Sequence, residues 1–556
     1  MLFSLIPFIL FLRSKWKRIL FYSMVSKQIP SWKNLQSRLF IYSGNRKKNK
    51  YYDNPPVAAI VNGELRSLQS EIEENAVIDL VYLNSRDGRA VYRKTLCFLL
   101  SYASSIVYPD RTLVSGHSLG DGYYFYYRDK AKADIKKLKN AMQDAINDDL
   151  IVDIERLSSK QSLSYVDERG LKETKDLLLS RNDGAYTFNR LGNCRSVYYE
   201  PLLPSLSLLS VWDLMEYGEG MLLRYPQSRQ MNSMMAFQDN PLLFSVFEDA
   251  RSKACILDVD SLGSLNLKEA SGKIREVIVL SETLQRRSFY HVAELIKEKG
   301  GVKIAFISGP ACSGKKTCGL KLCAELKIQG YSPIMLSLDD YRKNDDSGNS
   351  FVDVTLLQEE VRTLLKGKEV TLSSSDNDKK RLFRTQKAKM EENTILVIEG
   401  VQTLNENLIP GLNENEIYRI YVSALTQLNL DTMSSISTRD NRLIRRIVKE
   451  CRLRDIRPSQ VINEWSDIEE EEKNLLFPYQ NNADVMINSA LEYELGVLYP
   501  YIMPLLRSVT LEEGKAYTTA RRLMGFLELI NPISPELVPP DSILREFIGG
   551  SAFLLS

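Results

Sequence analysis

The feature that most constrains the fold of this sequence is a strand–loop–helix pattern in its second half. It consists of an apolar run, a glycine-containing loop and a helix-like stretch. Residues 302–308 (VKIAFIS) have the composition of a short buried strand in a parallel sheet. The loop 309–317 (GPACSGKKT) follows directly, and 319–330 (GLKLCAELKIQG) has helical character. Glycines let backbone N–H groups turn towards phosphate oxygens, and a helix N-terminus adds partial positive charge. This order predicts a GxxxxGK phosphate-binding loop.

Two lysines at the end of this loop have opposite consequences. Lys315 has the position that reaches the β- and γ-phosphates of a nucleotide. The next position is Ser or Thr in the GxxxxGK[ST] pattern, and its hydroxyl binds Mg²⁺, but here it is Lys316. Thr317 cannot simply take over, because one helical step rotates a side chain by about 100°. We therefore expect a weakened Mg²⁺ site. The residues expected to bind the nucleotide are Gly309, Pro310, Ala311, Cys312, Ser313, Gly314, Lys315, Lys316 and Thr317.

Two further apolar runs lead into acidic residues. SPIMLS (332–337) is followed by Asp339 and Asp340, and TILVI (394–398) by Glu399. Ligands bind at the carboxyl ends of the strands in a doubly wound sheet, so these carboxylates are expected to face the phosphate loop. A helix N-cap is the alternative role for the aspartate pair.

Arginines recur in the stretch 421–458, which is expected to contain a helix. They are Arg442, Arg445, Arg446, Arg452 and Arg454. In kinases a basic helix can close over the phosphates and stabilise charge on the transferring group. A solvated basic surface is the alternative.

The first half of the chain predicts small α+β units. Segment 57–82 reads as a strand, an Asn62-Gly63 turn and two more strands, because Asn-Gly tolerates the positive φ angles of a tight hairpin. Further along we expect a helix at 91–106, a strand pair at 114–127, an amphipathic helix at 130–148, a β-rich stretch at 199–225 and a helical connector at 236–300.

From about residue 56 to the end, the sequence resembles two known families joined in one chain. VNGEL, GHSLGDGYYF and LLPS followed by GMLLRYP resemble the TGS and second additional domains of threonyl-tRNA synthetase. The phosphate loop, the Asp440-Asn441-Arg442 signature and the stretches 477–506 and 539–551 resemble the uridine kinases of the phosphoribulokinase/uridine kinase type. The same order of domains occurs in a family of nucleoside kinase-like proteins.

The resemblance implies an α/β fold, in which a P-loop kinase domain with a mainly parallel, doubly wound sheet follows two small α+β domains. The expected boundaries are a basic N-terminal arm at 1–50, a TGS-like domain at 51–90, a second-additional-domain-like unit at 91–235, a helical connector at 236–300, the P-loop domain at 301–510 and a C-terminal extension at 511–556.

The resemblance also implies an ATP-dependent phosphotransferase that moves the γ-phosphate of ATP to a nucleoside or similar hydroxyl. Asp339 matches the family's general base, and Glu399 matches the Walker B carboxylate that holds Mg²⁺ through water. The expected catalytic residues are Lys315, Asp339, Arg442, Arg445 and Arg446. A degenerate kinase that acts as a non-enzymatic nucleotide- or RNA-binding module is the alternative.

Several positions depart from the kinase pattern. Gln402 stands where the family has a histidine, and the acceptor-side loop is replaced by 373–384 (SSSDNDKKRLFR). Glu469 to Glu472 follow Trp465 where the family has an Arg-Gly-Glu stretch, and four carboxylates there would repel phosphate. These departures favour the non-enzymatic alternative and leave the acceptor open.

The synthetase-like part has lost the metal ligands of its family. The family's His-x-x-x-His pair corresponds to Lys94 and Phe98, and the later Cys/His pair falls in YYEPLLPS, which has neither residue. Lysine and phenylalanine cannot replace imidazole ligands, so we expect no metal-dependent editing of tRNA. His117 is then expected to be structural.

Composition limits the remaining function classes. A chain of 556 residues needs several domains, and a net charge of +2 gives no electrostatic case for RNA or membrane partners. Seven scattered cysteines suit reduced thiols in the cytoplasm. The apolar run 1–12 is too short to span a bilayer. The arm 1–50 is expected to be disordered or to include an upstream-extended start, with Met24 as the true initiator, and a weak interfacial anchor is the alternative.

Overall fold

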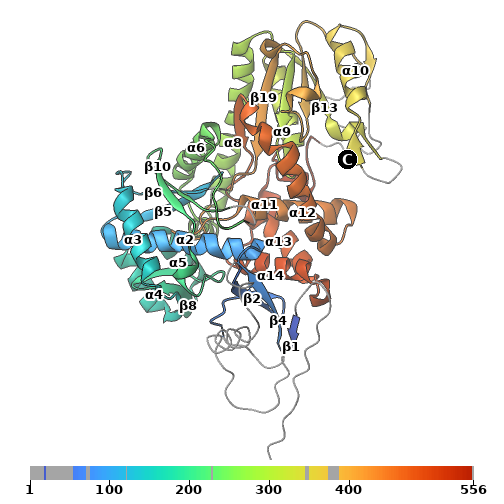
Figure 1. The fold of residues 1–556 in the computed structure, drawn as a ribbon. Coiled ribbons are helices and arrows are strands. Elements are labelled where there is room, and N and C mark those ends of the chain that lie inside the picture. Colours follow the sequence, from blue (N-terminus) through green and yellow to red (C-terminus); the bar gives the residue numbers. More distant parts are fainter. Residues whose placement is uncertain are drawn as a thin grey trace, which may run out of the picture.

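The computed structural model describes residues 18–20, 54–70, 76–120, 122–226, 230–344, 350–373, 387–426 and 428–553. The expected acceptor-side loop lies almost entirely outside these residues, as does the N-terminal arm apart from 18–20. Figure 1 shows the first half of the chain, coloured blue to green, beside a larger α/β half coloured green to red.

A parallel sheet is the centre of the second half. Among the described residues it has five strands in the order β13-β18-β12-β19-β20, all parallel. They are β12 (Ile304–Ser308), β13 (Ser332–Ser337), β18 (Thr394–Glu399), β19 (Ile417–Ser423) and β20 (Val485–Asn488). The predicted α/β fold with a parallel doubly wound sheet is therefore confirmed, and the three predicted strands of this half lie where expected.

Successive residues of the central strand face two different cores. Ala305 and Ile307 belong to a cluster with residues of α8 (Ile274–Lys299), α9 (Lys315–Ile328) and α13 (Glu494–Arg507). Ile304 and Phe306 pack with α10 (Val354–Leu365) on the opposite face. Figure 1 shows α9 and α10 on opposite sides of the sheet. Both faces are buried, which explains why the strand reads as an apolar run.

The C-terminal residues share the core of the sheet. Besides α11 (Thr438–Arg454) and α12 (Pro458–Leu475), this half contains α14 (Lys515–Leu527) and the short α15 (Arg545–Ile548). Leu523 of α14 and Phe547 of α15 are fully buried in the same cluster as α9. Residues far apart in sequence thus build the surroundings of one loop. Smaller strands at the sheet's edge are β14 (Arg342–Asn344), β15 (Ser350–Val352), β16 (Val370–Thr371) and β17 (Lys387–Ala388).

The N-terminal sheet has the strand order β1-β4-β2-β3. Its strands are β1 (Arg18–Leu20), β2 (Pro56–Val61), β3 (Glu64–Arg66) and β4 (Val77–Tyr82). Asn62 and Gly63 join β2 to β3 with φ angles of 50° and 82°, as the predicted hairpin turn requires. The predicted helix at 91–106 is longer than expected, α2 (Arg86–Val107), because the Ser85 side chain caps its first turn.

Residues 113–224 form a second α+β unit with two antiparallel sheets, ordered β10-β11-β6-β5 and β7-β8-β9. The strands are β5 (Leu113–Leu119), β6 (Gly122–Tyr127), β7 (Asp153–Ser158), β8 (Ala185–Leu191), β9 (Cys194–Val197), β10 (Asp213–Tyr217) and β11 (Gly220–Arg224). The helices are α3 (Ile135–Asn147), α4 (Ser159–Glu168) and α5 (Lys172–Arg181).

Two predictions in this unit need correction. In the stretch 199–225 the strands begin only at Asp213, because Pro201 and Pro204 lack the N–H that a ladder needs, and Ser205 forms just an isolated bridge to Ile151. The helix expected at 130–148 begins at Ile135, where the Asp134 side chain accepts a hydrogen bond from the Lys137 N–H.

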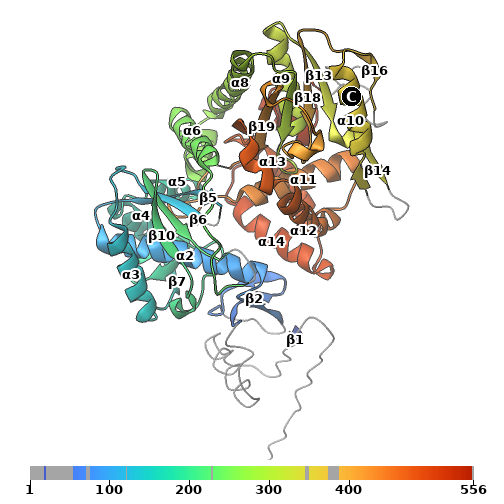
Figure 2. The same ribbon diagram turned by 45° about the horizontal axis from the view of Figure 1, so that its top comes forward.

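A helical connector and one loop join the two halves. The stretch 236–300 contains α6 (Pro241–Leu257), α7 (Leu262–Ala270) and α8. The loop that precedes α11 reaches into the 113–224 unit, where Asn429 Nδ2 donates to the Ser115 carbonyl at 2.9 Å and Thr432 Oγ1 to Glu173 at 2.9 Å. Figure 2 shows α11 to α14 between the parallel sheet and β2. Within the described residues, no helix is both long and apolar enough to cross a bilayer.

Candidate phosphate-binding site

The loop 309–317 connects β12 to α9, as the sequence predicts. Gly309 has φ 156° and Gly314 has φ 81°, conformations that side-chain-bearing residues rarely adopt. A Cβ atom on Gly309 would lie 2.0 Å from the Val422 carbonyl oxygen, and one on Gly314 would lie 2.8 Å from Ile543. Both glycines are therefore required by backbone conformation and by space.

The side chains of Lys315 and Ser313 differ in their hydrogen bonding within the loop. Lys315 is the first residue of α9, and its Nζ donates to the Pro310 carbonyl at 3.0 Å. Ser313 is fully buried, and its Oγ has no hydrogen-bond partner among the described residues. An orphaned buried hydroxyl is uncommon in native structures, and here it lies in the loop expected to bind phosphate.

A carboxylate from α12 is bound to this loop. The Ala311 N–H donates to Glu472 Oε1 at 2.7 Å. Both terminal nitrogens of Arg442 in α11 donate to the same carboxylate, at 2.7 Å to Oε1 and 2.9 Å to Oε2. Arg442 also donates to the Ala311 carbonyl at 3.3 Å. Arg442 and Glu472 are both buried. A bidentate, fully desolvated pair of this kind is rigid and directional.

The two other expected arginines of α11 differ in their distance from the loop. Arg445 is fully buried, forms an ion pair with Glu494 and donates to the Cys312 carbonyl at 3.2 Å. Arg446 instead lies 3.5 Å from Glu464 of α12. Arg442 and Arg445 thus hydrogen-bond to carbonyl groups of the loop, whereas Arg446, one helical turn after Arg442, forms an ion pair with Glu464.

The C-terminal segment also contacts the loop. Thr317 Oγ1 donates to Glu546 Oε2 at 2.7 Å, and Lys449 Nζ donates to Glu546 Oε1 at 2.7 Å. Burial would raise the pKa of Glu546, but Lys449 and Thr317 hold it below its usual value. The Thr317 hydroxyl is therefore engaged by a carboxylate.

The expected acidic residues lie at the ends of neighbouring strands. Glu399 ends β18 in register with Ile307 of the central strand, is buried, and accepts a hydrogen bond from Ser337 Oγ. Asp339 follows β13, is exposed, and accepts from Arg342 Nε at 3.0 Å. The Ser337 side chain caps the short turn that contains Asp339 and Asp340, so this cap does not need the aspartates.

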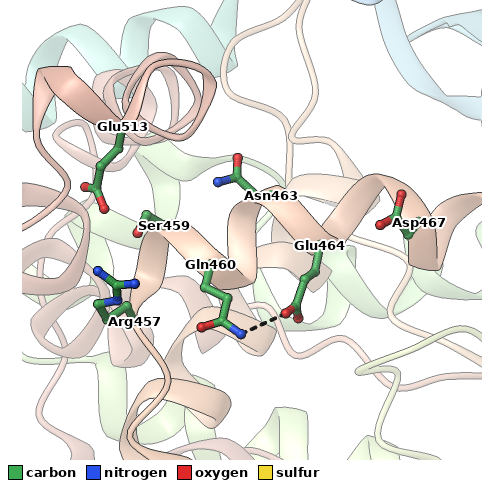
Figure 3. Close-up of a pocket in the computed structure, with 7 residues that line it drawn as sticks. All are labelled: Arg457, Ser459, Gln460, Asn463, Glu464, Asp467 and Glu513. Carbon is green, nitrogen blue, oxygen red and sulfur yellow. Dashed lines mark hydrogen bonds between the residues drawn. The ribbon is translucent and has the colours of Figure 1, made fainter. Parts of the chain in front are cut away.

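Two hollows lie away from the loop. One of about 500 Å³ is lined by Arg457, Glu513 and polar residues on one face of α12 (Figure 3). The other, of about 230 Å³, lies beside Asn405 and Arg419. No residue of 309–317 lines either of them. The loop contacts described above are therefore the better guide to chemistry.

The synthetase-like positions carry an ion pair and a packed ring. Lys94 forms an ion pair with Glu200, which lies in the YYEPLLPS segment, and Phe98 is buried. Within the described residues, no group of three or more His, Cys, Asp or Glu side chains could hold a metal ion. His117 stacks on Phe247 with ring centroids 3.3 Å apart, and burial, with Arg251 nearby, lowers its pKa to about 3.

Sequence reasoning identified the loop but missed its protein partners. The sequence treats the four glutamates at 469–472 as one repelling group, but among the contacts of the described residues Glu472 alone of the four bonds to the loop. A signal was present, because Glu472 lies seven residues after Trp465 and thus on the same face of a helix. Trp465 is buried, so that face points inward. Glu494 and Glu546 gave no comparable signal.

Comparisons with known proteins agree with the two resemblances only in outline. No protein-family model matches the chain. The chain is 23% identical over 183 residues to a threonine–tRNA ligase of Acetivibrio thermocellus, which covers 32% of this chain and 28% of the ligase. It is 28% identical over 163 residues to that of Syntrophotalea carbinolica, covering 28% and 26%. The chain thus spans about a quarter of the length of these relatives.

A solved structure described as a possible uridine kinase from Bacillus stearothermophilus aligns with 36% of this chain and 98% of its own. Its identity of 18% and TM-score of 0.24 are too low to carry an argument about function. The class that the structure itself defines is an α/β protein with a P-loop domain. In sequence, part of the chain is similar to threonine–tRNA ligases.

Proposed function

We propose that the second half of the chain binds ATP through the loop 309–317 and transfers its γ-phosphate to a hydroxyl of a nucleoside or similar small acceptor. The observation that carries this proposal is a GxxxxGK loop at the carboxyl end of the central strand, with Glu399 at the end of the adjacent strand. Ligands of parallel α/β sheets bind at this edge. Uridine is the acceptor suggested by the resemblance to uridine kinases.

Each residue has a role in this proposal. The loop amides and Lys315 bind the terminal phosphates. Asp339 is exposed and accepts the acceptor's hydroxyl proton, while Arg442 and Arg445 stabilise charge on the transferring group. Arg446, which forms an ion pair with Glu464, is the third arginine proposed for that task.

A magnesium ion fits these residues only weakly. Glu399 would hold it through water, but Ser337 already donates to this carboxylate. The loop hydroxyl that binds Mg²⁺ is replaced by Lys316, and the Thr317 hydroxyl donates to Glu546. No step of the proposed reaction is therefore assigned to a metal ion.

A second candidate function is nucleotide binding without transfer. Lys316 and Gln402 favour it, because they depart from the kinase pattern where a Mg²⁺-binding hydroxyl and a histidine are expected. The threonine–tRNA ligase relatives suggest RNA as a partner of the first half, without further support from net charge. A cytoplasmic location also remains a proposal.

An ATP-consumption assay over a panel of nucleosides tests the proposal. We expect consumption that depends on the nucleoside and is lost in Asp339→Asn, which keeps the side-chain volume but cannot accept the proton. The matched control is Asp340→Asn, one residue away. ATP binding without nucleoside-dependent consumption would support the non-enzymatic candidate instead.

A further inference from the structure

The carboxylate of Glu472 is held by groups that would otherwise meet a phosphate. Its Oε1 accepts from the Ala311 N–H and from Arg442, both at 2.7 Å, and its Oε2 accepts from Arg442 at 2.9 Å. A backbone N–H of the loop and a guanidinium fork are the donors that bind phosphoryl oxygens in kinases. An amide hydrogen and a bidentate guanidinium that are engaged by one anion are not available to another.

We infer that Glu472 is a built-in competitor for nucleotide, a protein carboxylate bound in the phosphate-binding loop that must leave before phosphate can enter. The inference rests on the proposed nucleotide binding at the loop 309–317. The inference assigns the competition with nucleotide to Glu472 itself, and not to general repulsion by the four carboxylates at 469–472.

The neighbouring glutamates differ from Glu472 in their surroundings. Glu470 and Glu471 are exposed, and Glu469 forms ion pairs with Arg86 and Arg439. Electrostatic repulsion by the run would involve all four carboxylates, and it would be screened by salt where they are exposed. A direct contact with the Ala311 N–H belongs to Glu472 alone among them in the described residues.

Glu472 lies in the last turn of α12, the part of a helix that opens at the lowest cost. It lies three residues before the last residue of α12, which ends at Leu475 and is followed by a short turn. The last turn of a helix has unsatisfied carbonyl groups and opens more easily than the middle. Trp465 lies two turns earlier and stacks on Arg442 at 5.2 Å, so Arg442 is still held at the loop when Glu472 leaves.

Inorganic pyrophosphate is the direct probe of this competition. We compare the full-length parent, Glu472→Ala and the matched control Glu471→Ala, which removes an exposed carboxylate from the same helix. We expect Glu472→Ala to bind pyrophosphate at least about ten-fold more tightly than both others, because the loop amide and Arg442 are then free. Equal pyrophosphate affinities in all three proteins would overturn the inference.

A second comparison locates the gain in the loop. Adding Lys315→Ala to Glu472→Ala should abolish the gain in pyrophosphate affinity. A gain that persists would mean that Arg442 merely attracts anions outside the loop. That result would overturn the inference. Should Glu472→Ala fail to fold, Glu472→Gln keeps the volume and an acceptor oxygen. It should give a smaller gain in the same direction, and no gain would count against the inference.

ATP separates this inference from the proposed function. If Glu472→Ala gains affinity for pyrophosphate but does not bind ATP, the competition is real and nucleotide binding is wrong. If the parent binds ATP as tightly as Glu472→Ala does, nucleotide binding stands and the competition is wrong.

Discussion

The hydroxyl of Thr317, in the first turn of α9, donates a 2.7 Å hydrogen bond to Glu546, near the C-terminus of the chain. Glu546 also pairs with Lys449 of α11 at 2.7 Å. One carboxylate thus connects the phosphate loop, the arginine-rich helix and the last helix. The C-terminal segment is therefore part of the surroundings of the loop, and its removal should disturb the loop directly.

Glu546→Gln should lower the free energy of unfolding by about 2–3 kcal/mol at pH 7, because it leaves Lys449 without its counter-charge in a largely buried setting. Urea denaturation measures this change. Glu536→Gln, at an exposed position nearby, is the control and should stay within about 0.5 kcal/mol of the parent.

The stability difference between the parent and Glu546→Gln should depend on pH. The folded-state pKa of Glu546 lies below the usual 4.5, so its contribution to stability is fully present above that value and is lost as pH falls through the folded pKa. The stability difference between parent and Glu546→Gln should therefore shrink on acidification below about pH 4.5. A difference that is unchanged or larger at low pH would contradict the assigned ion pair.

Arg522→Met should destabilise the protein more than Arg521→Met, although the two arginines are adjacent on α14. Arg522 donates two 2.7 Å hydrogen bonds to the buried Asp440, whose pKa Arg522 and Arg439 hold well below its usual range against the effect of burial. Its loss should cost about 2–3 kcal/mol, because the buried Asp440 then loses both 2.7 Å hydrogen bonds and is left with the longer ion pair to Arg439 at 3.2 Å.

Arg521 is the matched control for this prediction. It pairs with Glu64 at the surface, so its replacement should cost at most about 1 kcal/mol. Chemical denaturation of both variants measures the difference. Equal effects would mean that the Asp440 pair is not a buried link between α11 and α14.

Lys316→Thr should raise phosphoryl transfer about ten-fold or more, because it supplies a hydroxyl at the expected metal position and removes a competing charge. Steady-state ATP consumption across a Mg²⁺ titration measures the rate of phosphoryl transfer in both proteins. In the parent, nucleotide binding should depend little on Mg²⁺. Tighter Mg²⁺ linkage without any turnover would support the non-enzymatic candidate.

The purified protein should retain no stoichiometric zinc, and it should not deacylate mischarged tRNA. Lys94 corresponds to a metal ligand in the resemblance, and it forms an ion pair with Glu200 of the YYEPLLPS segment, where the later ligands would fall. Elemental analysis after dialysis against a chelator checks this prediction. About one zinc per chain would overturn it.

The sequence predicts the strands of the parallel sheet well, because residues buried on both faces produce short apolar runs such as 332–337 and 394–398. It also predicts the turn from strand to helix at 309–317, since Gly309 and Gly314 are required there by backbone conformation. It could not predict β7 to β9, whose alternating pattern is weak. The stretch 199–212 was misread because its prolines, not its apolar residues, decide its pairing.

The partners of the candidate site were harder to predict for a different reason. Glu472 lies 161 residues from its loop partner Ala311, and Glu546 lies 229 residues from Thr317. Glu494 contacts Arg445 across 49 residues. Such contacts depend on tertiary packing, and local periodicity does not encode them. The role of Arg442 as a partner of a protein carboxylate was invisible for the same reason.

Isothermal titration of ATP into the parent and into Lys315→Ala tests the central claim most directly. Lys315 supplies the charge that anchors the terminal phosphates, so its removal should weaken ATP binding by about ten- to a hundred-fold, while circular dichroism shows an unchanged fold. Lys315→Ala binding ATP as tightly as the parent would contradict the account, because the loop 309–317 would then not be a phosphate-binding site.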